Sequence, residues 1–158
     1  MRCLRPASSP PLGPLQLSNY DQATAAVVAH EAAEAAGGGP VAFLNCPCIF
    51  AEARKARPDL PCHLVDFDPR YRAAEGPGRA TTYDPEAPAT AALPLGLHHG
   101  FAAVVAEPTE PTQESLARAA KLVTLLARND AAIVFLLIPE SLRQPACGLD
   151  LNLRWVAR

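Results

Sequence analysis

Two carboxylates interrupted by prolines follow a short apolar segment near the middle of the chain. Phe101–Ala106 is apolar throughout, and Glu107-Pro108-Thr109-Glu110 comes directly after it. In an open α/β sheet, ligands bind where the carboxyl end of a strand meets the next helix. Glu107, Pro108 and Glu110 are therefore candidate catalytic residues. The alternative is a capped, proline-stiffened turn from strand to helix, and the motif by itself favours neither interpretation.

A second acidic candidate ends another expected strand, in the segment HLVDFDP at residues 63–69. Asp66 at the tip of such a strand can accept hydrogen bonds from both hydroxyl groups of a ribose, as in nucleotide-binding α/β folds. An aspartate that caps the following turn is the alternative, and it is the favoured one unless a second feature supports a cofactor.

The loop after the first expected strand lacks the glycines of a dinucleotide site. Val41–Leu44 is followed by Asn45-Cys46-Pro47-Cys48, whereas the three consecutive glycines precede the strand. This loop offers a tight turn and one amide side chain but no GxGxxG, so binding of an NAD-type pyrophosphate is not expected. A cofactor without a pyrophosphate, such as S-adenosylmethionine, tolerates that loss better.

The five cysteines form no recognisable metal site. Cys46 and Cys48 make a CxC pair, but four-ligand zinc sites usually combine two such pairs, and the sequence has no second one. We expect buried free thiols in a reducing compartment and no bound metal. His98 and His99 are expected to be solvated in a surface turn.

These candidates need a scaffold in which strands and helices alternate, and glycine, proline and capping signals divide the chain accordingly. Helices are expected at 24–36, 50–57 and 112–128, with a short one within 87–97. Strands are expected at 41–44, 64–67, 79–83, 101–106 and 131–138, with 149–156 as a further candidate. The continuous apolar segment 131–138 is typical of the centre of a parallel sheet. The alternation predicts an α/β fold with a doubly wound, mostly parallel sheet.

The composition fits one globular domain. The chain has 158 residues, and with 49% hydrophobic and 19% charged residues it can bury a sizeable core. A formal net charge of −2 leaves no basic footprint, so a nucleic-acid partner is not expected. Residues 1–16 are proline-rich and predict a disordered leader before a domain at 17–158. The sequence has no bilayer-length apolar segment and no signal-peptide core, which predicts a cytoplasmic protein without a membrane partner.

Several short motifs occur in a characteristic order between about residues 17 and 140. They are Leu17-Ser18, Thr24-Ala25 with Ala29 and Glu31-Ala32, Asn45–Cys48, Asp66-Phe67-Asp68-Pro69-Arg70-Tyr71, Tyr83-Asp84, and the stretch from Phe101 through Leu116 to Leu126. In this order they resemble the family of N6-adenine-methyltransferase-like proteins that includes the elongation factor 1-alpha lysine methyltransferases. The chain is identified as a divergent member of that family, with altered motifs.

The resemblance implies a Rossmann-like, class I methyltransferase fold, S-adenosylmethionine as cofactor and a protein lysine as substrate, with a translation elongation factor as candidate partner. It implies that Asp66 binds the ribose, that Phe67 is a further cofactor-binding residue, and that Asn45, Cys46, Pro47 and Cys48 line the methionine end.

The resemblance also places Glu107-Pro108-Thr109-Glu110 where that family has Asp/Asn-Pro-Pro-Tyr/Phe, whose acid or amide accepts a hydrogen bond from the target amine. Here the acid is one methylene longer, and Thr109 and Glu110 replace the second proline and the aromatic residue.

Three functions follow from this altered motif. The first is a protein-lysine methyltransferase, and the second is a catalytically silent relative that acts as a binding or regulatory module. The third, a nucleic-acid adenine methyltransferase, is disfavoured by the missing base-stacking aromatic residue and by the acidic charge balance. A monomer is expected. The chain stops near its expected sixth strand, short of the family's C-terminal region, so a sheet truncated at that end is a further expectation.

Overall fold

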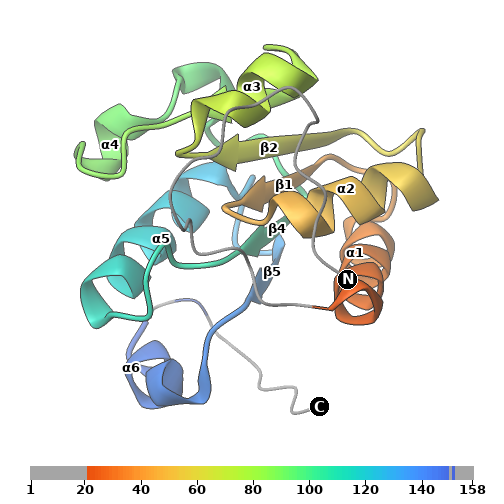
Figure 1. Cartoon of the computed structure of the whole chain (residues 1–158). Coiled ribbons are helices and arrows are strands. Elements are labelled where there is room, and N and C mark those ends of the chain that lie inside the picture. The colour runs from red at the N-terminus through yellow and green to blue at the C-terminus, as the bar shows by residue number, and fades with distance from the viewer. Residues whose placement is uncertain (1–20, 150, 152–158) are drawn as a thin grey trace.

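An all-parallel sheet of five strands forms the centre of the molecule. The computed structural model describes residues 21–149 and 151. The strands lie in the order β3-β2-β1-β4-β5 (Figure 1). They are β1 Val41–Leu44, β2 Cys62–Asp66, β3 Ala80–Thr82, β4 Ala103–Ala106 and β5 Ile133–Leu136. The α-helices are α1 Gln22–Ala36, α2 Pro47–Ala56, α3 Pro69–Glu75, α4 Ala89–Ala92, α5 Gln113–Leu126 and α6 Arg143–Cys147, and the 3-10 helices are η1 Leu95–Leu97 and η2 Glu140–Leu142.

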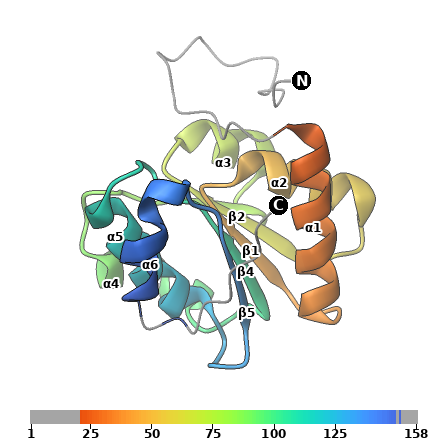
Figure 2. The same cartoon turned by 90° about the horizontal axis from the view of Figure 1, so that it is seen from below.

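Helices cover both faces of this sheet. Figure 2 shows α1 and α2 on one side and α4, α5 and α6 on the other. The chain builds outward from β1 to β2 and β3, then returns to the other side of β1 to form β4 and β5. The order therefore reverses between β1 and β4, and in open α/β sheets ligands bind at such a reversal, beyond the carboxyl ends of the strands. The predicted doubly wound α/β fold is confirmed.

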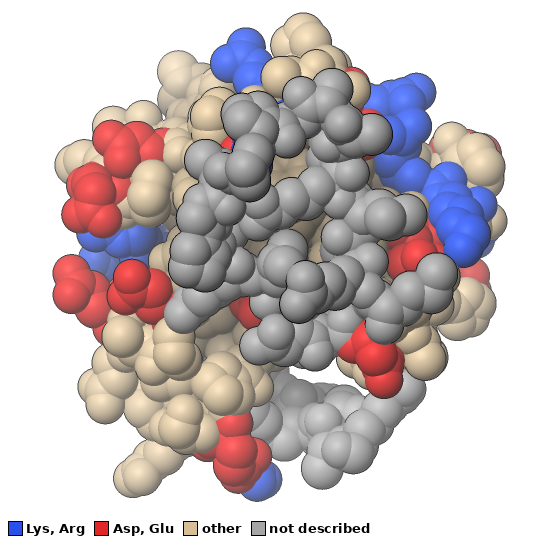
Figure 3. Space-filling view, viewed as in Figure 1, with Lys and Arg blue, Asp and Glu red and all other residues tan. Residues whose placement is uncertain are grey.

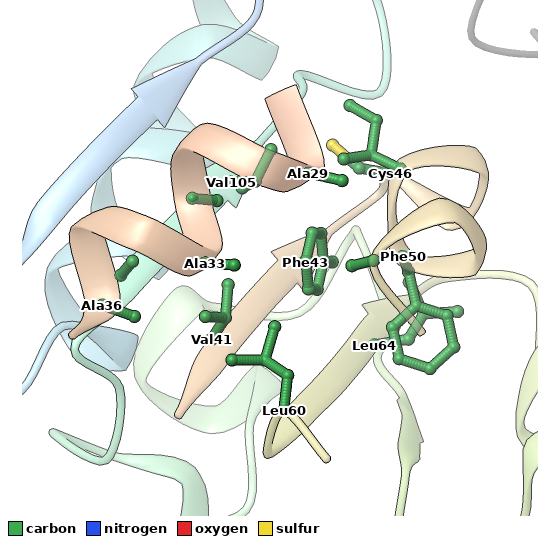
Figure 4. Close-up of a cluster of buried hydrophobic side chains, with 14 of the residues drawn as sticks. Ala29, Ala33, Ala36, Val41, Phe43, Cys46, Phe50, Leu60, Leu64 and Val105 are labelled. Carbon is green, nitrogen blue, oxygen red and sulfur yellow. The ribbon is translucent and has the colours of Figure 1, made fainter. Parts of the chain in front are cut away.

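Helix α1 shields one sheet face with alanine side chains. The Asp21 carboxylate caps its start by accepting the Thr24 N–H at 2.7 Å, and Gly37 ends it in the left-handed conformation at φ 57°. Every buried side chain of α1 is an alanine, so the helix lies close to the strands. Figure 4 shows Ala29 and Ala33 near Phe43 of β1. Phe43 and Phe50 pack edge to face in this core, with ring centroids 5.8 Å apart.

Two helices begin at prolines, and this changes two sequence expectations. Helix α2 starts at Pro47 rather than at residue 50, and α3 starts at Pro69 with the Asp68 carboxylate as its cap. A strand was expected at 64–67, and no helix was predicted directly after it. Proline suits the first turn of a helix because the N–H that it lacks has no partner in the helix.

Helix α5 follows the expected amphipathic pattern. The hydroxyl group of Thr112 accepts the Ser115 N–H at 3.2 Å and caps the start of the helix. Leu116, Leu122, Val123 and Leu126 are buried at helical spacing. The helix ends at Leu126, two residues before the expected end.

Strand β5 corrects the expectation of a central position for 131–138. Among the described residues it pairs only with β4, which makes it an edge strand, and Ile133 is 45% exposed. Its apolar run has another cause. Val134 and Leu136 pack toward the side of α5, whereas Phe135 and Leu137 pack toward the side of α1. Both faces of the strand are covered although one edge has no partner among these residues.

Two sequence expectations fall wholly or largely outside the described residues. The leader at 1–16 is one of them. The other is the strand at 149–156, of which only Leu149 and Leu151 are described, and neither lies in a strand. Within the described part of the chain, no helix is long and apolar enough to cross a bilayer.

Candidate functional site

The strand register brings polar residues from four strands to one edge of the sheet. Leu44 of β1 aligns with Val65 of β2 and with Ala106 of β4. The next residues, Asn45, Asp66 and Glu107, therefore lie at the same level along the strands. Tyr83 directly follows β3 and lies at the same edge, one residue further along, because Thr82 aligns with Asp66. We call Asn45, Asp66, Tyr83 and Glu107 the carboxyl-edge cluster.

Asn45 is the link between the strand ends. Its side-chain Nδ2 donates to the carbonyl oxygen of Glu107 at 2.9 Å, and its Oδ1 accepts the Tyr83 hydroxyl at 3.0 Å. Its backbone has φ 58°, in the left-handed region that asparagine tolerates better than most residues. Asn45 thus makes the sharp turn for which dinucleotide-binding loops use glycine, and its amide fixes the segment after β4.

Tyr83 is a member of the cluster to which sequence reasoning gave no role. It is buried, and burial raises the pKa of its hydroxyl group to about 12, so the group stays protonated and donates to Asn45. The sequence expectation placed Tyr83 inside a strand at 79–83, whereas β3 ends at Thr82, so Tyr83 directly follows the strand and lies level with the residue after Asp66. A residue that follows a strand belongs to the same edge as the residues that follow the neighbouring strands.

Asp66 is buried, and its surroundings disfavour the charged form. The pKa of its carboxyl group is raised to about 7, mainly by burial and in smaller part by the nearby acids Asp68 and Glu107. One oxygen, Oδ1, accepts the Asp68 N–H at 2.9 Å. This bond is the one expected if Asp66 caps the turn after β2, which was the alternative to a role in binding a ribose. The other oxygen makes no hydrogen bond with the described residues.

Asp68, two residues after Asp66, has a separate structural role. The carboxylate of Asp68 accepts the Arg70 N–H at 3.0 Å and binds the Arg70 guanidinium group through two donors, so it caps α3 and forms an ion pair. Phe67 lies between the two acids in sequence, and its half-buried side chain packs against the core on the α5 side. The structure thus separates an engaged acid, Asp68, from one with capacity left, Asp66.

The segment after β4 places its two acids differently. Glu107 is half-buried, and its N–H donates to the carbonyl of Leu44 at 3.0 Å, which continues the β1–β4 pairing. Pro108 is buried next to it. Glu110 is exposed, and its N–H donates to the Ser115 hydroxyl at 3.1 Å at the start of α5. Glu107 therefore belongs to the carboxyl-edge cluster, whereas Glu110 belongs to the entry of α5.

The residues from Cys46 to Cys48 belong mainly to the start of α2. Cys46 is a buried free thiol whose Sγ donates to the carbonyl of Leu44 at 3.2 Å, and burial raises the pKa of that thiol well above its usual value. Pro47 and Cys48 form the first turn of the helix. Cys62 and Cys147 are also free thiols, but Cys48 is disulfide-bonded, so the expectation of free thiols is wrong at Cys48. Over the described ranges, no three His, Cys, Asp or Glu side chains gather as metal ligands.

The sheet order, its two helical layers and the polar cluster at the β1–β4 reversal define the class of this protein. It has a Rossmann-like α/β fold of the methyltransferase type. The comparison with family models agrees and is more specific. The model of the family described as "Probable N6-adenine methyltransferase" matches residues 19–147, and the chain belongs to this family. The search of curated proteins found no match.

Proposed function

We propose that the chain is an S-adenosylmethionine-dependent methyltransferase that modifies a lysine side chain of a protein. Membership of a methyltransferase family supports the class of reaction. The single observation that supports this site is the carboxyl-edge cluster, in which Asp66 at the end of β2 and Glu107 after β4 lie level on either side of β1, next to the reversal between β1 and β4. In this proposal Asp66 holds the cofactor and Glu107 faces the target amine.

The polar groups near Asp66 fit a ribose. One oxygen of its buried carboxyl group makes no hydrogen bond with the described residues. The neighbouring Thr82 hydroxyl is buried and has no hydrogen-bond partner in the described part of the chain. Buried polar groups without partners are rare in native proteins, because each costs free energy. A ligand with adjacent hydroxyl groups would satisfy both, while Asn45, Cys46, Pro47 and Cys48 would border its methionine end.

Glu107 suits the recognition of a lysine. When bound, S-adenosylmethionine supplies an activated methyl group, and a lysine must present its amine in the neutral form to accept it. A carboxylate at the end of β4 attracts the ammonium form from solution and can accept the proton that the amine gives up. The bond from Asn45 Nδ2 to the Glu107 carbonyl keeps this segment in place. Pro108 restricts the backbone directly after the acid.

The charge of the molecule favours a protein substrate over a nucleic acid. The formal net charge is −2, and the cluster itself contains two acids. On the part of the face that Figure 3 leaves uncovered, Lys and Arg side chains of the described residues lie in separate places with Asp and Glu side chains near them. Phosphate backbones require a basic patch, whereas a lysine-bearing segment does not. Elongation factor 1-alpha is the first substrate to test.

One observation favours a second function, that of a catalytically silent binding module. Where this sequence departs from the family motif, Thr109 and Glu110 both contact Ser115 of α5, at 2.9 and 3.1 Å. Glu110 replaces the aromatic residue of the family motif and is exposed, so the motif supplies no aromatic side chain to pack against an amine near Glu107. Orientation of the amine is a large part of what such a site contributes to the rate.

The two functions are separated by measuring cofactor binding and methyl transfer on the same variants. We expect Asp66→Ala to weaken S-adenosylmethionine binding by about tenfold or more, the scale of one charge-assisted hydrogen bond. Asp84→Ala is the control, because Asp84 is exposed and accepts a similar local bond from the Glu86 N–H. Calorimetry measures both.

Transfer of a labelled methyl group to elongation factor 1-alpha is then compared between the unaltered chain and Glu107→Gln. Lost transfer with retained cofactor binding supports the enzyme. Cofactor binding without transfer to any candidate protein supports the silent module. Absence of cofactor binding at millimolar concentration would overturn both the cofactor and the enzyme.

A further inference from the structure

A hollow of about 390 Å³ lies at the opposite edge of the sheet from the carboxyl-edge cluster. Residues at the amino ends of four strands line it, among them Pro40 before β1, Cys62 and His63 in β2, Arg79 before β3 and Phe101 before β4. Its volume is within the range of small-molecule sites. Strand β2 thus begins at this hollow and ends at Asp66.

The floor of the hollow is apolar and its backbone is held in place. Pro40 and Pro61 bring no N–H groups, and their carbonyl oxygens accept Ala102 N–H and Val41 N–H at 2.8 and 2.9 Å. Phe101 is buried and its ring centroid lies 6.3 Å from that of His63. A ligand with an apolar body therefore meets a floor that needs no rearrangement.

His63 adds a polar group with a fixed orientation. Its Nε2 is 2.9 Å from the Thr81 hydroxyl oxygen. Burial lowers the pKa of the imidazole, so the ring is mostly neutral at pH 7. The ring thus adds no fixed charge to the hollow.

Two arginines give the hollow its charge, and they differ in their partners. Arg54 of α2 forms an ion pair with Glu75 of α3 and lies over the Phe50 ring. Arg79 is exposed and forms no ion pair with any described carboxylate. Its backbone is nevertheless fixed, because its N–H donates to Gly76 and its carbonyl accepts the Leu64 N–H. One guanidinium group with five donors is therefore available at the mouth of the hollow, beside its apolar floor.

We infer that this amino-edge hollow binds a small organic anion, with the phosphate or carboxylate group on Arg79 and the apolar body on the floor formed by Pro61 and Phe101. A guanidinium group matches both anions through paired hydrogen bonds. The neutral ring of His63 allows an aromatic or aliphatic body to lie beside it. The inference does not depend on the methyltransferase proposal, since the two sites lie at opposite ends of the strands.

The test uses the full chain and three probes that share one body. Phenyl phosphate and benzoate carry the anion, and benzyl alcohol carries the body alone. We expect at least one of the two anions to bind with a Kd of about 1 mM or below and at least about tenfold more tightly than benzyl alcohol. The anion that binds more tightly identifies the preferred group. Chemical-shift changes in a labelled chain should include His63 and Phe101.

Two arginine variants test the assignment of the charge. Arg79→Gln should weaken binding of the preferred anion by about tenfold, the loss of one charge-assisted contact. Arg72→Gln is the control, because Arg72 is an exposed residue of α3 that does not line the hollow. Arg79→Lys keeps the charge but not the paired donors. Its affinity for the preferred anion should lie between those of the unaltered chain and Arg79→Gln. If Arg79→Gln does not fold, the Lys variant alone carries the comparison.

Three results would overturn the inference. The first is that neither anion binds at about 10 mM, which is weaker than specific small-molecule recognition. The second is that benzyl alcohol binds as tightly as the anions. The third is unchanged affinity in the Arg79 variants. S-adenosylmethionine binding in the same samples reports separately on the carboxyl-edge cluster.

Discussion

At the scale of single residues, Asn45 explains how this chain dispenses with a glycine-rich loop. Its left-handed backbone makes the turn after β1, and its amide joins Tyr83 to the backbone of Glu107. Sequence reasoning named Asn45 as a turn residue with one amide to offer, but not its partners. The partners follow β3 and β4 along the chain, so only the order of strands in the sheet brings them to Asn45.

The paired threonines of β3 give a residue-scale prediction. The Thr82 hydroxyl is buried without a hydrogen-bond partner among residues 21–149 and 151, whereas the Thr81 hydroxyl is 2.9 Å from His63 Nε2. Thr82→Val should raise the free energy of unfolding by about 1 kcal/mol, because it removes an unsatisfied polar group at nearly constant volume. Thr81→Val should lower it by about the same amount. Urea denaturation of both variants measures the contrast, and equal effects would contradict the assignment.

Asp66 gives a prediction about pH. Its pKa is about 7 in the folded chain and 3.8 as the ordinary value, so the folded state holds the proton to higher pH than the unfolded state. The stability that this group contributes is therefore complete below about pH 4 and is lost as the pH rises through 7. The free energy of unfolding falls by at most about 4 kcal/mol through this titration.

Asp66→Asn should remove most of this pH dependence, because an amide does not titrate. Its oxygen can still accept the Asp68 N–H, so the local structure is kept. Unfolding by urea from pH 4 to pH 8 measures it, with Asp84→Asn as the exposed control. The same slope in Asp66→Asn and the unaltered chain would refute the assignment of this titration to Asp66.

At the scale of elements, local signals predicted most helices and strands, and the misses have physical reasons. Strand β1 was predicted with its observed bounds, because glycines and a proline precede it and Asn45 turns the chain after it. Helix α3 was missed because seven residues carry too little periodicity, and its Asp-Pro start also fits a strand end. The position of β5 at the edge of the described sheet could not be predicted, since an apolar run indicates two covered faces and not the number of neighbouring strands.

The turn between α1 and β1 provides an element-scale prediction. A Cβ atom on Gly39 would lie 2.7 Å from the Cβ of Ala102, at the entry to β4, whereas one on Gly96 would meet no atom within 4 Å. Gly39→Ala should therefore lower the free energy of unfolding by about 1 to 3 kcal/mol through overpacking. Gly96→Ala should change it little. Thermal unfolding of the two variants makes the comparison, and equal melting temperatures would contradict the close approach.

At the scale of the whole molecule, the family and the strand order define a fold whose two sheet edges carry different chemistry. The carboxyl edge has two acids and two amide or hydroxyl partners, and the amino edge has a hollow lined by prolines, Phe101, His63 and two arginines. The sequence predicted the first edge through the residues that follow strands. It could not predict the second, whose lining comes from α2 and from residues before or at the start of four different strands.

Cofactor binding gives a prediction for the whole molecule. A ligand that binds only the folded chain stabilises it, by about 2.7 kcal/mol at a concentration about 100 times its Kd. S-adenosylmethionine should therefore raise the melting temperature in proportion to the logarithm of its concentration, and Asp66→Ala should shift that curve to higher concentration. Adenine alone, which has no ribose, is the control. A melting temperature that does not change with S-adenosylmethionine would exclude binding in this range.

The position of β1 between β2 and β4 also has a consequence for synthesis of the protein. Glu107 follows Asn45 by 62 residues, so β4 leaves the ribosome well after β1 and β2. At about 5 to 20 residues per second, the delay is about 3 to 12 s. In the later part of this delay, once β2 has paired with it, β1 has one paired edge and one row of backbone groups without its final partner. The nascent chain is therefore most vulnerable to wrong strand pairing in the interval between the translation of β2 and that of β4.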